Sequence, residues 1–286
     1  MRADHDVAFV FVGPDGVGDW FGDFVSVGEW RHDSDLATAG RLAGLAIEHA
    51  VDLALRGDVA GVVTAPIDKF ALHAGGYDFP GHTEMLASLA DNVPVAMLMV
   101  AEHTVRHGPL RVTLATTHLP LAAVPRAVTT TLLIEQTQLT HYALVRSWQI
   151  GKPRLALCAL NPHASDGGLF GDEESRIMQP AVAELIARGI RVVGPVAADT
   201  VFVRAMSGEF DAVIAPYHDV GMAAFKTAAF GHGVNVTLGL PFVRTSPDHG
   251  TAIDIAGTGT ADSSSMAEAI RLAIRLATRN LQKSER

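Results

Sequence analysis

Short apolar runs alternate with longer amphipathic segments along this chain. The short runs end at glycine, proline or polar residues, which is typical of strands buried on both faces. These predicted strands cover residues 7–12, 59–64, 95–100, 111–116, 155–160, 190–193 and 212–215. The longer segments predict helices over residues 34–56, 124–148, 174–188 and 266–281. Strands that alternate with helices favour an α/β fold with a largely parallel sheet and helices on both faces.

Two of the predicted helices carry signals at their ends. In the first, we expect Ser34 to cap the start and Gly57 to stop the helix. Between them lies one apolar stripe, formed by Leu36, Ala39, Ala43, Ile47, Val51 and Leu55. In the last helix, Ser265 and Glu268 have the spacing of a capping box, which predicts a helix start there.

Three histidines, His118, His163 and His218, each follow the end of an apolar run within a few residues. Ligands of α/β sheets bind beyond the carboxyl ends of the strands, and neutral imidazoles are common ligands of divalent cations. The pattern therefore predicts that the three side chains converge on one divalent metal, with an open position for substrate. A single histidine in such a place is more often an ordinary loop residue, so the hypothesis depends on the repetition.

A second polar group, Lys226, Asn235 and Arg244, lies among apolar residues later in the chain. Arg244 follows the apolar run 238–243, so we expect it to enter a buried strand, where a charge needs a partner. Its planar guanidinium suits a carboxylate or phosphate, and Lys226 adds a point charge. Ordinary surface charge is the competing interpretation.

Residues near two predicted helix starts are expected to lie at the same edge of the sheet. His82 and Thr83 open a short helix, whose dipole favours an anion near its first turn. Lys69 comes just past the carboxyl end of the strand over residues 59–64, at or near another helix start.

Composition narrows the classes of partner and compartment. The 286 residues, 48% of them hydrophobic, are enough for one large core or two lobes. The net charge of −9 argues against a nucleic acid partner, and an anionic substrate would need a local basic site. No apolar run is long enough for a transmembrane helix, and the start lacks the pattern of a signal peptide. The single cysteine, Cys158, lies in an apolar run, which predicts a buried residue rather than a nucleophile and suits a reducing cytoplasm.

Seven motifs, in order, resemble those of the 4-hydroxythreonine-4-phosphate dehydrogenase family. They are T-A-P-I-D-K (64–69), G-H-T-E (81–84), T-T-H-L-P-L (116–121), A-L-N-P-H-A (159–164), Y-H-D-V-G (217–221), V-N-V-T-L-G-L-P-F-V-R-T-S (234–246) and D-H-G-T-A-I-D-I-A-G (248–257). The last also resembles the cofactor loop of isocitrate and isopropylmalate dehydrogenases, which share that family's fold. The resemblance extends from about residue 35 to the C-terminus.

The resemblance implies one dehydrogenase unit over residues 1–286, with two interleaved lobes and a cleft between them. It implies oxidation of a phosphorylated β-hydroxy acid by NAD or NADP, followed by decarboxylation, with one divalent metal (Zn, Mg or Co). The implied substrate is 4-phosphohydroxy-L-threonine, in the cytoplasmic biosynthesis of pyridoxal phosphate. The implied assembly is a homodimer with the active site at its interface, without a nucleic acid or membrane partner.

The same resemblance assigns roles to individual residues. The metal ligands would be His118, His163 and His218, the last of them from the partner subunit. The substrate would contact His82, Thr83, Lys226, Asn235 and Arg244. The cofactor would contact His249, Gly250, Thr251 and Asp254. We expect catalysis to involve Lys69, His218 and Asp219, and the general base stays open among them.

Two departures from the family pattern open alternatives. The strand and G-D-P-A-G-I-G-P-E-like turn that begin the family are expected to be missing, because G-P-D-G-V-G (13–18) predicts a plain turn. Val220 and Met222 stand where the family usually has Gln and Leu. The alternatives are a relative acting on threonate or erythronate 4-phosphate or on an aromatic cis-dihydrodiol carboxylate, and an inactive binding homologue. A metal-dependent hydrolase or aldolase also uses three histidines, but it gives no role to the loop at 248–257.

Overall fold

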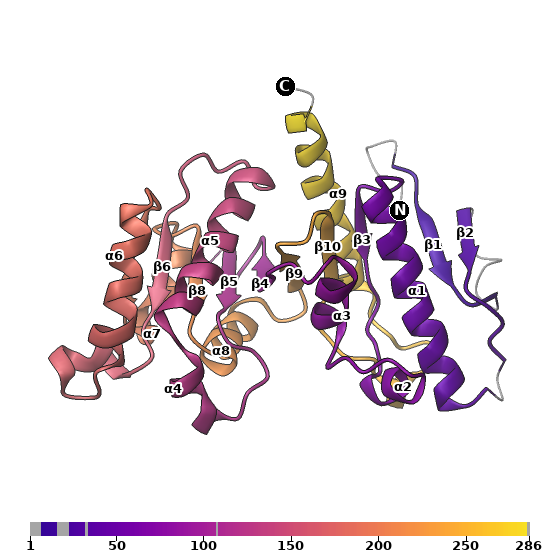
Figure 1. Ribbon diagram of the computed structural model, residues 1–286, viewed down its shortest axis with the longest axis horizontal. Coiled ribbons are helices and arrows are strands. Elements are labelled where there is room, and N and C mark those ends of the chain that lie inside the picture. Colours follow the sequence, from indigo (N-terminus) through magenta and orange to yellow (C-terminus); the bar gives the residue numbers. More distant parts are fainter. Residues whose placement is uncertain (1–6, 16–22, 32–33, 107, 285–286) are drawn as a thin grey trace.

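The computed structural model describes residues 7–15, 23–31, 34–106 and 108–284, and its main element is an eight-stranded sheet (Figure 1). In spatial order the strands are β3 (Gly61–Val63), β10 (Val243–Pro247), β9 (Val234–Leu238), β4 (Ala96–Ala101), β5 (Leu110–Leu114), β8 (Ala212–Ala215), β6 (Leu155–Cys158) and β7 (Val192–Val196). A separate parallel pair is formed by β1 (Val10–Gly13) and β2 (Asp23–Ser26).

Helices cover both faces of this sheet. The α-helices are α1 (Leu36–Arg56), α2 (Lys69–Ala74), α3 (His82–Leu89), α4 (Val124–Ala127), α5 (Thr130–Arg146), α6 (Gln179–Ala187), α7 (Ala198–Met206), α8 (His218–Ala229) and α9 (Ser264–Ser284). One π-helical turn over Glu174–Met178 precedes α6. Turns of 3-10 helix lie at Leu121–Ala123, Pro162–Gly168 and Ile253–Ile255.

The α/β class with a central sheet flanked by helices is confirmed. In the eight-stranded sheet as described, four of the seven pairings are parallel, and the three antiparallel ones join β10, β9, β4 and β5 in its centre. The connections from β4 to β5 and from β9 to β10 are too short to hold the crossover that parallel neighbours need. These short connections explain why the sheet is more mixed than the alternation of strands and helices predicts.

Three hydrophobic cores fill the space between sheet and helices. One joins α5, α6 and α9 to one face of the sheet, and a second joins α7 and α8 to the other face. The third lies among α1, α2 and α3, around Leu72, Met85 and Leu86. In Figure 1, α6 and α7 lie at one end of the molecule and α1 at the other, with β4 and β9 between them.

The strands β9 and β10 are apolar on one face and polar on the other. The even-numbered residues of β9 pack in the core that includes α9, so Asn235 and Thr237 face the opposite side. In β10, the hydroxyl of Thr245 donates to the Ala269 carbonyl of α9 at 2.8 Å, which leaves Arg244 on that opposite side. The alternation thus places three polar side chains on one face of the central strands.

The predicted limits of the first helix are confirmed at one end and corrected at the other. Asp35, not Ser34, caps α1, because its carboxylate accepts the Thr38 N–H at 2.7 Å. Gly57 ends the helix as predicted, with a left-handed φ of 80° that favours glycine.

Other predicted elements change for local reasons. The helix expected over residues 124–148 is two helices, because Thr129 caps a new start at α5. The capping box at Ser265 is wrong, because α9 begins at Ser264, two residues before the predicted Met266, where the Asp262 carboxylate accepts the Ser264 N–H at 2.9 Å. The Ser265 hydroxyl is instead buried and donates to the Gly233 carbonyl at 3.2 Å.

Two helices, α7 and α8, were not predicted. The segment of α8 carries polar residues that indicate a site rather than a regular apolar stripe. Residues 16–18 of the predicted N-terminal turn lie outside the described residues. Cys158 is fully buried, as predicted, and burial together with the charge of Glu174 raises its pKa to about 12, which makes it a poor nucleophile. Among the described helices, none is both long and apolar enough to cross a membrane.

We predict that Gly40→Ala destabilises the protein, because α1 crosses α2 so closely that a Cβ at Gly40 would overlap the Ala71 carbonyl oxygen. Overpacking of this kind costs about 1–3 kcal/mol. Chemical denaturation measures the change in free energy of unfolding. Gly151→Ala is the matched control, since a Cβ at Gly151 meets no atom within 4 Å. Equal stability of the two variants would contradict the close crossing.

Candidate active site

The ends of three adjacent parallel strands carry the histidines expected to bind a metal. β5, β8 and β6 are neighbours in that order, and they are followed by His118, His218 and His163 respectively. The rings of His118 and His218 lie side by side, with centroids 5.6 Å apart. Both line a cavity of about 100 Å³, together with Tyr217 and Asp219.

His163 does not complete a cluster within one chain. In the part of the chain that the structure describes, no group of three or more His, Cys, Asp or Glu side chains is placed to hold a metal ion. The His163 ring instead faces Phe170, with centroids 6.5 Å apart. The convergence of all three histidines within a single chain is therefore absent from these described residues, and the three-histidine set stays a prediction.

Two of the histidines have a carboxylate beside the Nδ1 atom. His218 Nδ1 lies 2.7 Å from Asp219 Oδ1, and His163 Nδ1 lies 3.8 Å from Asp199 Oδ2. A carboxylate in this place orients an imidazole and leaves its Nε2 for a cation. Asp219 was predicted, as a catalytic residue, whereas Asp199 was missed because it lies on the unpredicted helix α7. The sequence signal that could have identified Asp199 is its position shortly after the predicted strand over residues 190–193.

His118, which follows β5, lies where side chains of α2 and α3 approach the sheet. Burial lowers its pKa, the charges of Lys69 and His218 lower it further, and Glu84 acts in the opposite direction. Lys69 begins α2 and Glu84 lies in the first turn of α3, so both helices approach the end of β5. The structure thus brings the predicted Lys69 near the paired histidines and keeps the imidazole of His118 neutral at neutral pH.

Arg244 is the most unusual charge in the described chain. Its side chain is only 1% exposed, and it donates to the hydroxyls of Thr237 at 2.9 Å and Thr64 at 2.6 Å. No ion pair is formed with a described carboxylate, and its Nε–H has no partner. Burial lowers the pKa of Arg244 to about 10, so it is still charged at neutral pH. A buried charge without an anion is costly, so this site is suited to an anionic ligand.

His82 lies near this guanidinium, and Asn235 lies on the same face of the central strands. Burial, followed by the charge of Arg244, lowers the pKa of His82 to about 3, so its imidazole is neutral. His82 and Thr83 form the first turn of α3, and its N-cap residue Gly81 supplies no side-chain acceptor. The amide oxygen of Asn235 is buried without a partner. Both donors and acceptors are therefore available to a bound substrate.

The charge of Lys226 was expected to be available to an anion, but Asp248 already binds it. Its Nζ donates to Asp248 Oδ2 at 2.6 Å and to the Asp248 carbonyl at 3.0 Å, and the Asp248 side chain is 4% exposed. The carboxylate therefore compensates the charge of Lys226 in this structure. Asp248 was missed as a partner, because contacts between residues distant in sequence leave no local pattern.

The predicted cofactor loop begins at this ion pair. His249, Gly250, Thr251 and Asp254 follow Asp248 and are exposed. The loop contains two left-handed residues, Ala252 and Gly257, and a helical turn over Ile253–Ile255. It is therefore a surface segment anchored at its start, as a binding loop requires.

Comparisons with known proteins identify relatives of this chain. The model of the family described as pyridoxal phosphate biosynthetic protein PdxA matches residues 24–273. A 4-hydroxythreonine-4-phosphate dehydrogenase of Paracoccus denitrificans is 49% identical over 234 residues, which are 82% of this chain and 72% of that protein. A D-threonate 4-phosphate dehydrogenase of Salmonella typhimurium is 45% identical over 241 residues, which are 84% of this chain and 72% of that protein. A solved 4-hydroxythreonine-4-phosphate dehydrogenase of Klebsiella pneumoniae superposes with a TM-score of 0.80 at 42% identity, covering 89% of this chain and 78% of that one.

The α/β fold is shared with these relatives, and their names place the chain among the oxidoreductases of the dehydrogenase class. More narrowly, the chain belongs to the family of the pyridoxal phosphate biosynthetic protein PdxA. The resemblance inferred from the seven motifs is thereby confirmed.

We predict that His82 makes stability dependent on pH. Its pKa is about 3 in the folded protein and 6.5 ordinarily, so the unfolded chain binds more protons between these values. The free energy of unfolding should therefore fall as the pH drops from 6.5 toward 3. Urea denaturation across this range should show a shallower fall for His82→Gln than for the wild type. His49→Gln, at an exposed histidine, is the control, and an unchanged slope in His82→Gln would contradict the assignment.

Proposed function

We propose that this chain oxidises a phosphorylated β-hydroxy acid with NAD or NADP, assisted by a divalent metal, and that the product loses carbon dioxide. The favoured substrate is 4-phosphohydroxy-L-threonine, on the route to pyridoxal phosphate, as the names of the relatives suggest. The observation that supports the proposal most directly is Arg244, a buried guanidinium held only by hydroxyl groups. Such a charge fits a substrate phosphate or carboxylate.

The proposed metal ligands are His118, His163 and His218. Their donor chemistry fits: His118 is held neutral, and the other two have a carboxylate beside Nδ1. Imidazole ligands suit Zn²⁺ or Co²⁺ better than Mg²⁺, which prefers oxygen. When bound, such a cation lowers the pKa of the substrate hydroxyl and polarises the ketone that oxidation produces.

The residues of the chain itself would bind the substrate and move its proton. Arg244, His82, Thr83 and Asn235 would hold its anionic and hydroxyl groups. His82 lies close enough to Arg244 for that charge to lower its pKa, Thr83 follows it in the first turn of α3, and Asn235 has a buried amide oxygen without a partner. We assign proton transfer to Lys69, since its charge lies close enough to His118 to lower the pKa of that imidazole. Asp219 would keep His218 oriented. Lys226 would join the substrate only by leaving Asp248, so we expect a smaller contribution from it.

The proposed cofactor loop contains His249, Gly250, Thr251 and Asp254. NAD or NADP, when bound, supplies the hydride acceptor. The segment 248–265 includes three aspartates and neither Lys nor Arg. A 2′-phosphate needs a cationic partner, so we propose that NAD is preferred over NADP.

We propose a homodimer whose active site takes His218 of the partner subunit. Two observations support this assembly: one chain lacks a three-ligand group among its described residues, and apolar side chains beside the histidines are exposed. Those side chains are Leu119, Leu121, Leu169 and Phe170. Exposed apolar groups around an incomplete site are expected where a second subunit packs.

We also propose a cytoplasmic location. Cys158 is free and buried, and the structure holds no disulfide among its described residues. A chain of this kind suits a reducing compartment.

D-threonate 4-phosphate is the second candidate substrate. A relative with this activity in its name is nearly as similar to the chain as the 4-hydroxythreonine-4-phosphate dehydrogenase, at 45% against 49% identity. The two substrates differ at the second carbon, which carries an ammonium group in one and a hydroxyl in the other. Rates of nicotinamide reduction with each compound, in the presence of Zn²⁺ or Co²⁺, test the function and choose the substrate. Reduction with neither compound would refute the proposed activity.

We predict that Arg244→Ala lowers kcat/KM about tenfold to a hundredfold, because a charge-assisted partner of a buried anion is lost. Arg244→Lys should restore only part, since a point charge does not reproduce the planar fork. Steady-state kinetics measure both, and the KM for the dinucleotide should hardly change. Arg271→Ala is the control, because Arg271 is exposed and pairs only with Glu268. Wild-type kinetics of Arg244→Ala would show that Arg244 does not bind the substrate.

We predict that two inactive variants restore activity when they are co-expressed. His163→Ala and His218→Ala should each lose the metal, measured by elemental analysis. If each site joins two subunits, a mixed dimer keeps one intact site, so random pairing restores about a quarter of the wild-type activity. Sites contained within single chains would give no recovery, and that outcome would refute the shared site.

A further inference from the structure

The turn that carries His163 has a backbone that L-residues adopt reluctantly. His163, Ala164, Ser165 and Asp166 have φ values of 52°, 55°, 69° and 44°, and Gly167 continues in the same region. Only glycine tolerates this region freely. Four consecutive non-glycine residues in it need contacts from outside the turn to hold them.

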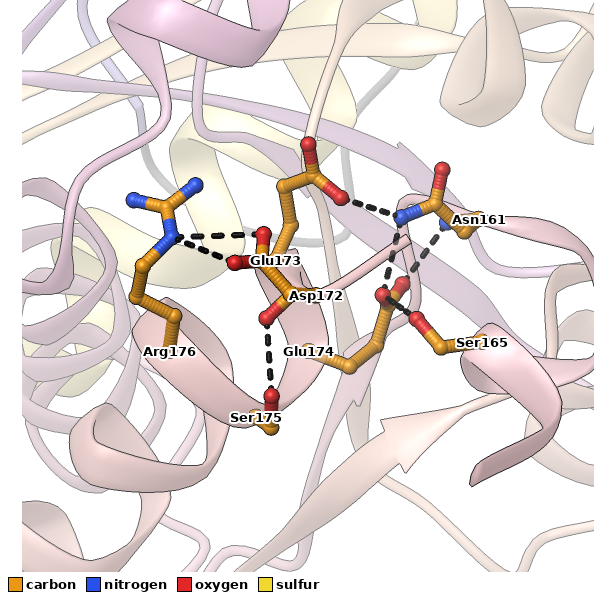
Figure 2. A network of polar contacts seen from close by, with 7 residues as sticks. All are labelled: Asn161, Ser165, Asp172, Glu173, Glu174, Ser175 and Arg176. Atoms are coloured by element: carbon orange, nitrogen blue, oxygen red, sulfur yellow. Dashed lines mark hydrogen bonds and ion pairs between the residues drawn. The ribbon is translucent and has the colours of Figure 1, made fainter. Parts of the chain in front are cut away.

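Those contacts come from Glu174, which lies at the start of the π-helical turn before α6 (Figure 2). Its Oε1 accepts the backbone N–H groups of Leu160 at 2.9 Å and Asn161 at 2.7 Å. Its Oε2 accepts the Asn161 side-chain amide at 2.9 Å and the Ser165 hydroxyl. Both carboxylate oxygens are thus used, on the two sides of His163.

The burial of Glu174 separates it from its acidic neighbours. Glu174 is 2% exposed, and burial alone would raise its pKa, but the bonds from Ser165 and Asn161 bring the pKa below its ordinary value. Within the described part of the chain, the Glu173 carboxylate accepts one bond, from the Asn161 side chain at 2.7 Å, and Asp172 pairs with the exposed Arg176. Of these three carboxylates, only Glu174 binds both ends of the segment from 160 to 165.

We propose that Glu174 is a positioning residue, whose carboxylate fixes the left-handed turn around His163 and thereby sets the affinity of the histidine site for a divalent cation. The inference rests on the proposed function for its second part. Glu174 touches neither the imidazole nor the proposed cation. It acts by joining the end of β6, the turn and the following helix, so that the His163 ring leaves the backbone in one direction.

The test compares Glu174→Gln with Glu173→Gln, which is the same substitution one residue away. A glutamine keeps the size of the side chain, but its amide nitrogen cannot accept from Asn161 or Ser165. Two quantities are measured on the full-length protein. Hydrogen exchange of the metal-free protein reports on the amides of residues 160–168. Competition with a chromophoric chelator gives the Co²⁺ affinity, and the visible spectrum of bound Co²⁺ reports its ligand geometry.

We expect Glu174→Gln to speed exchange in this segment, to change the Co²⁺ spectrum and to weaken Co²⁺ binding about tenfold to a hundredfold, the range found for groups that orient metal ligands. Glu173→Gln should match the wild type in all three. A role in general stability would lower the melting temperature without altering the spectrum of the bound ion, and that result would overturn the proposal. Wild-type affinity in Glu174→Gln would overturn it as well.

A second variant covers the case in which Glu174→Gln fails to fold. Ser165→Ala removes one of the four bonds, and we expect it to weaken Co²⁺ binding in the same direction by a smaller factor. Unchanged affinity and exchange in Ser165→Ala would then count against the proposal. If the wild type binds no Co²⁺, the metal function is refuted together with the effect on affinity, whereas the exchange rates still decide whether Glu174 holds the turn.

Discussion

The structure is constrained most strongly by a charge buried within its sheet. Arg244 enters the centre of the molecule from β10, and its acceptors among the described residues are the hydroxyls of Thr237 and Thr64. This is tolerable because neighbouring strands present polar residues on the same face, and because His82 stays neutral beside it. A guanidinium in such surroundings costs stability and gives a strong, directed interaction with an anion. The cost of burying Arg244 without an anion is therefore offset when an anionic ligand binds beside it.

The mixed topology of the sheet brings the parts of the site together. Antiparallel pairing of β9 with β10 and β4 places the polar face near the middle of the sheet, between α8 and α1–α3. The parallel strands β5, β8 and β6 then bring their carboxyl ends, and the histidines after them, to one edge. Lys69 and Glu84 reach the same edge from α2 and α3. Residues more than a hundred positions apart in sequence, such as Lys69 and His218, are thus brought to the same region.

Several acidic residues in this molecule hold other polar groups through hydrogen bonds or ion pairs. Asp219 and Asp199 lie beside Nδ1 atoms of histidines, Asp248 compensates Lys226, and Glu174 binds the backbone around His163. A carboxylate suits this role because it accepts several directed bonds at once. In the proposed site, imidazole and guanidinium groups would contact the ligands, whereas these carboxylates restrict the orientation of their neighbours.

The sequence by itself determined the class of fold and the family, and it predicted candidate residues for the site. Apolar runs locate strands because burial requires them, and His118, His163, His218 and Arg244 could be recognised because polar residues directly after such runs are unusual. Only the tertiary structure decided what these residues touch. It placed His118 beside His218 and left His163 apart. It also paired Lys226 with Asp248, and it brought the Glu174 carboxylate into hydrogen bonds with the turn that carries His163. The reason is that hydrophobic periodicity is local, whereas these contacts join segments whose approach depends on strand order and register.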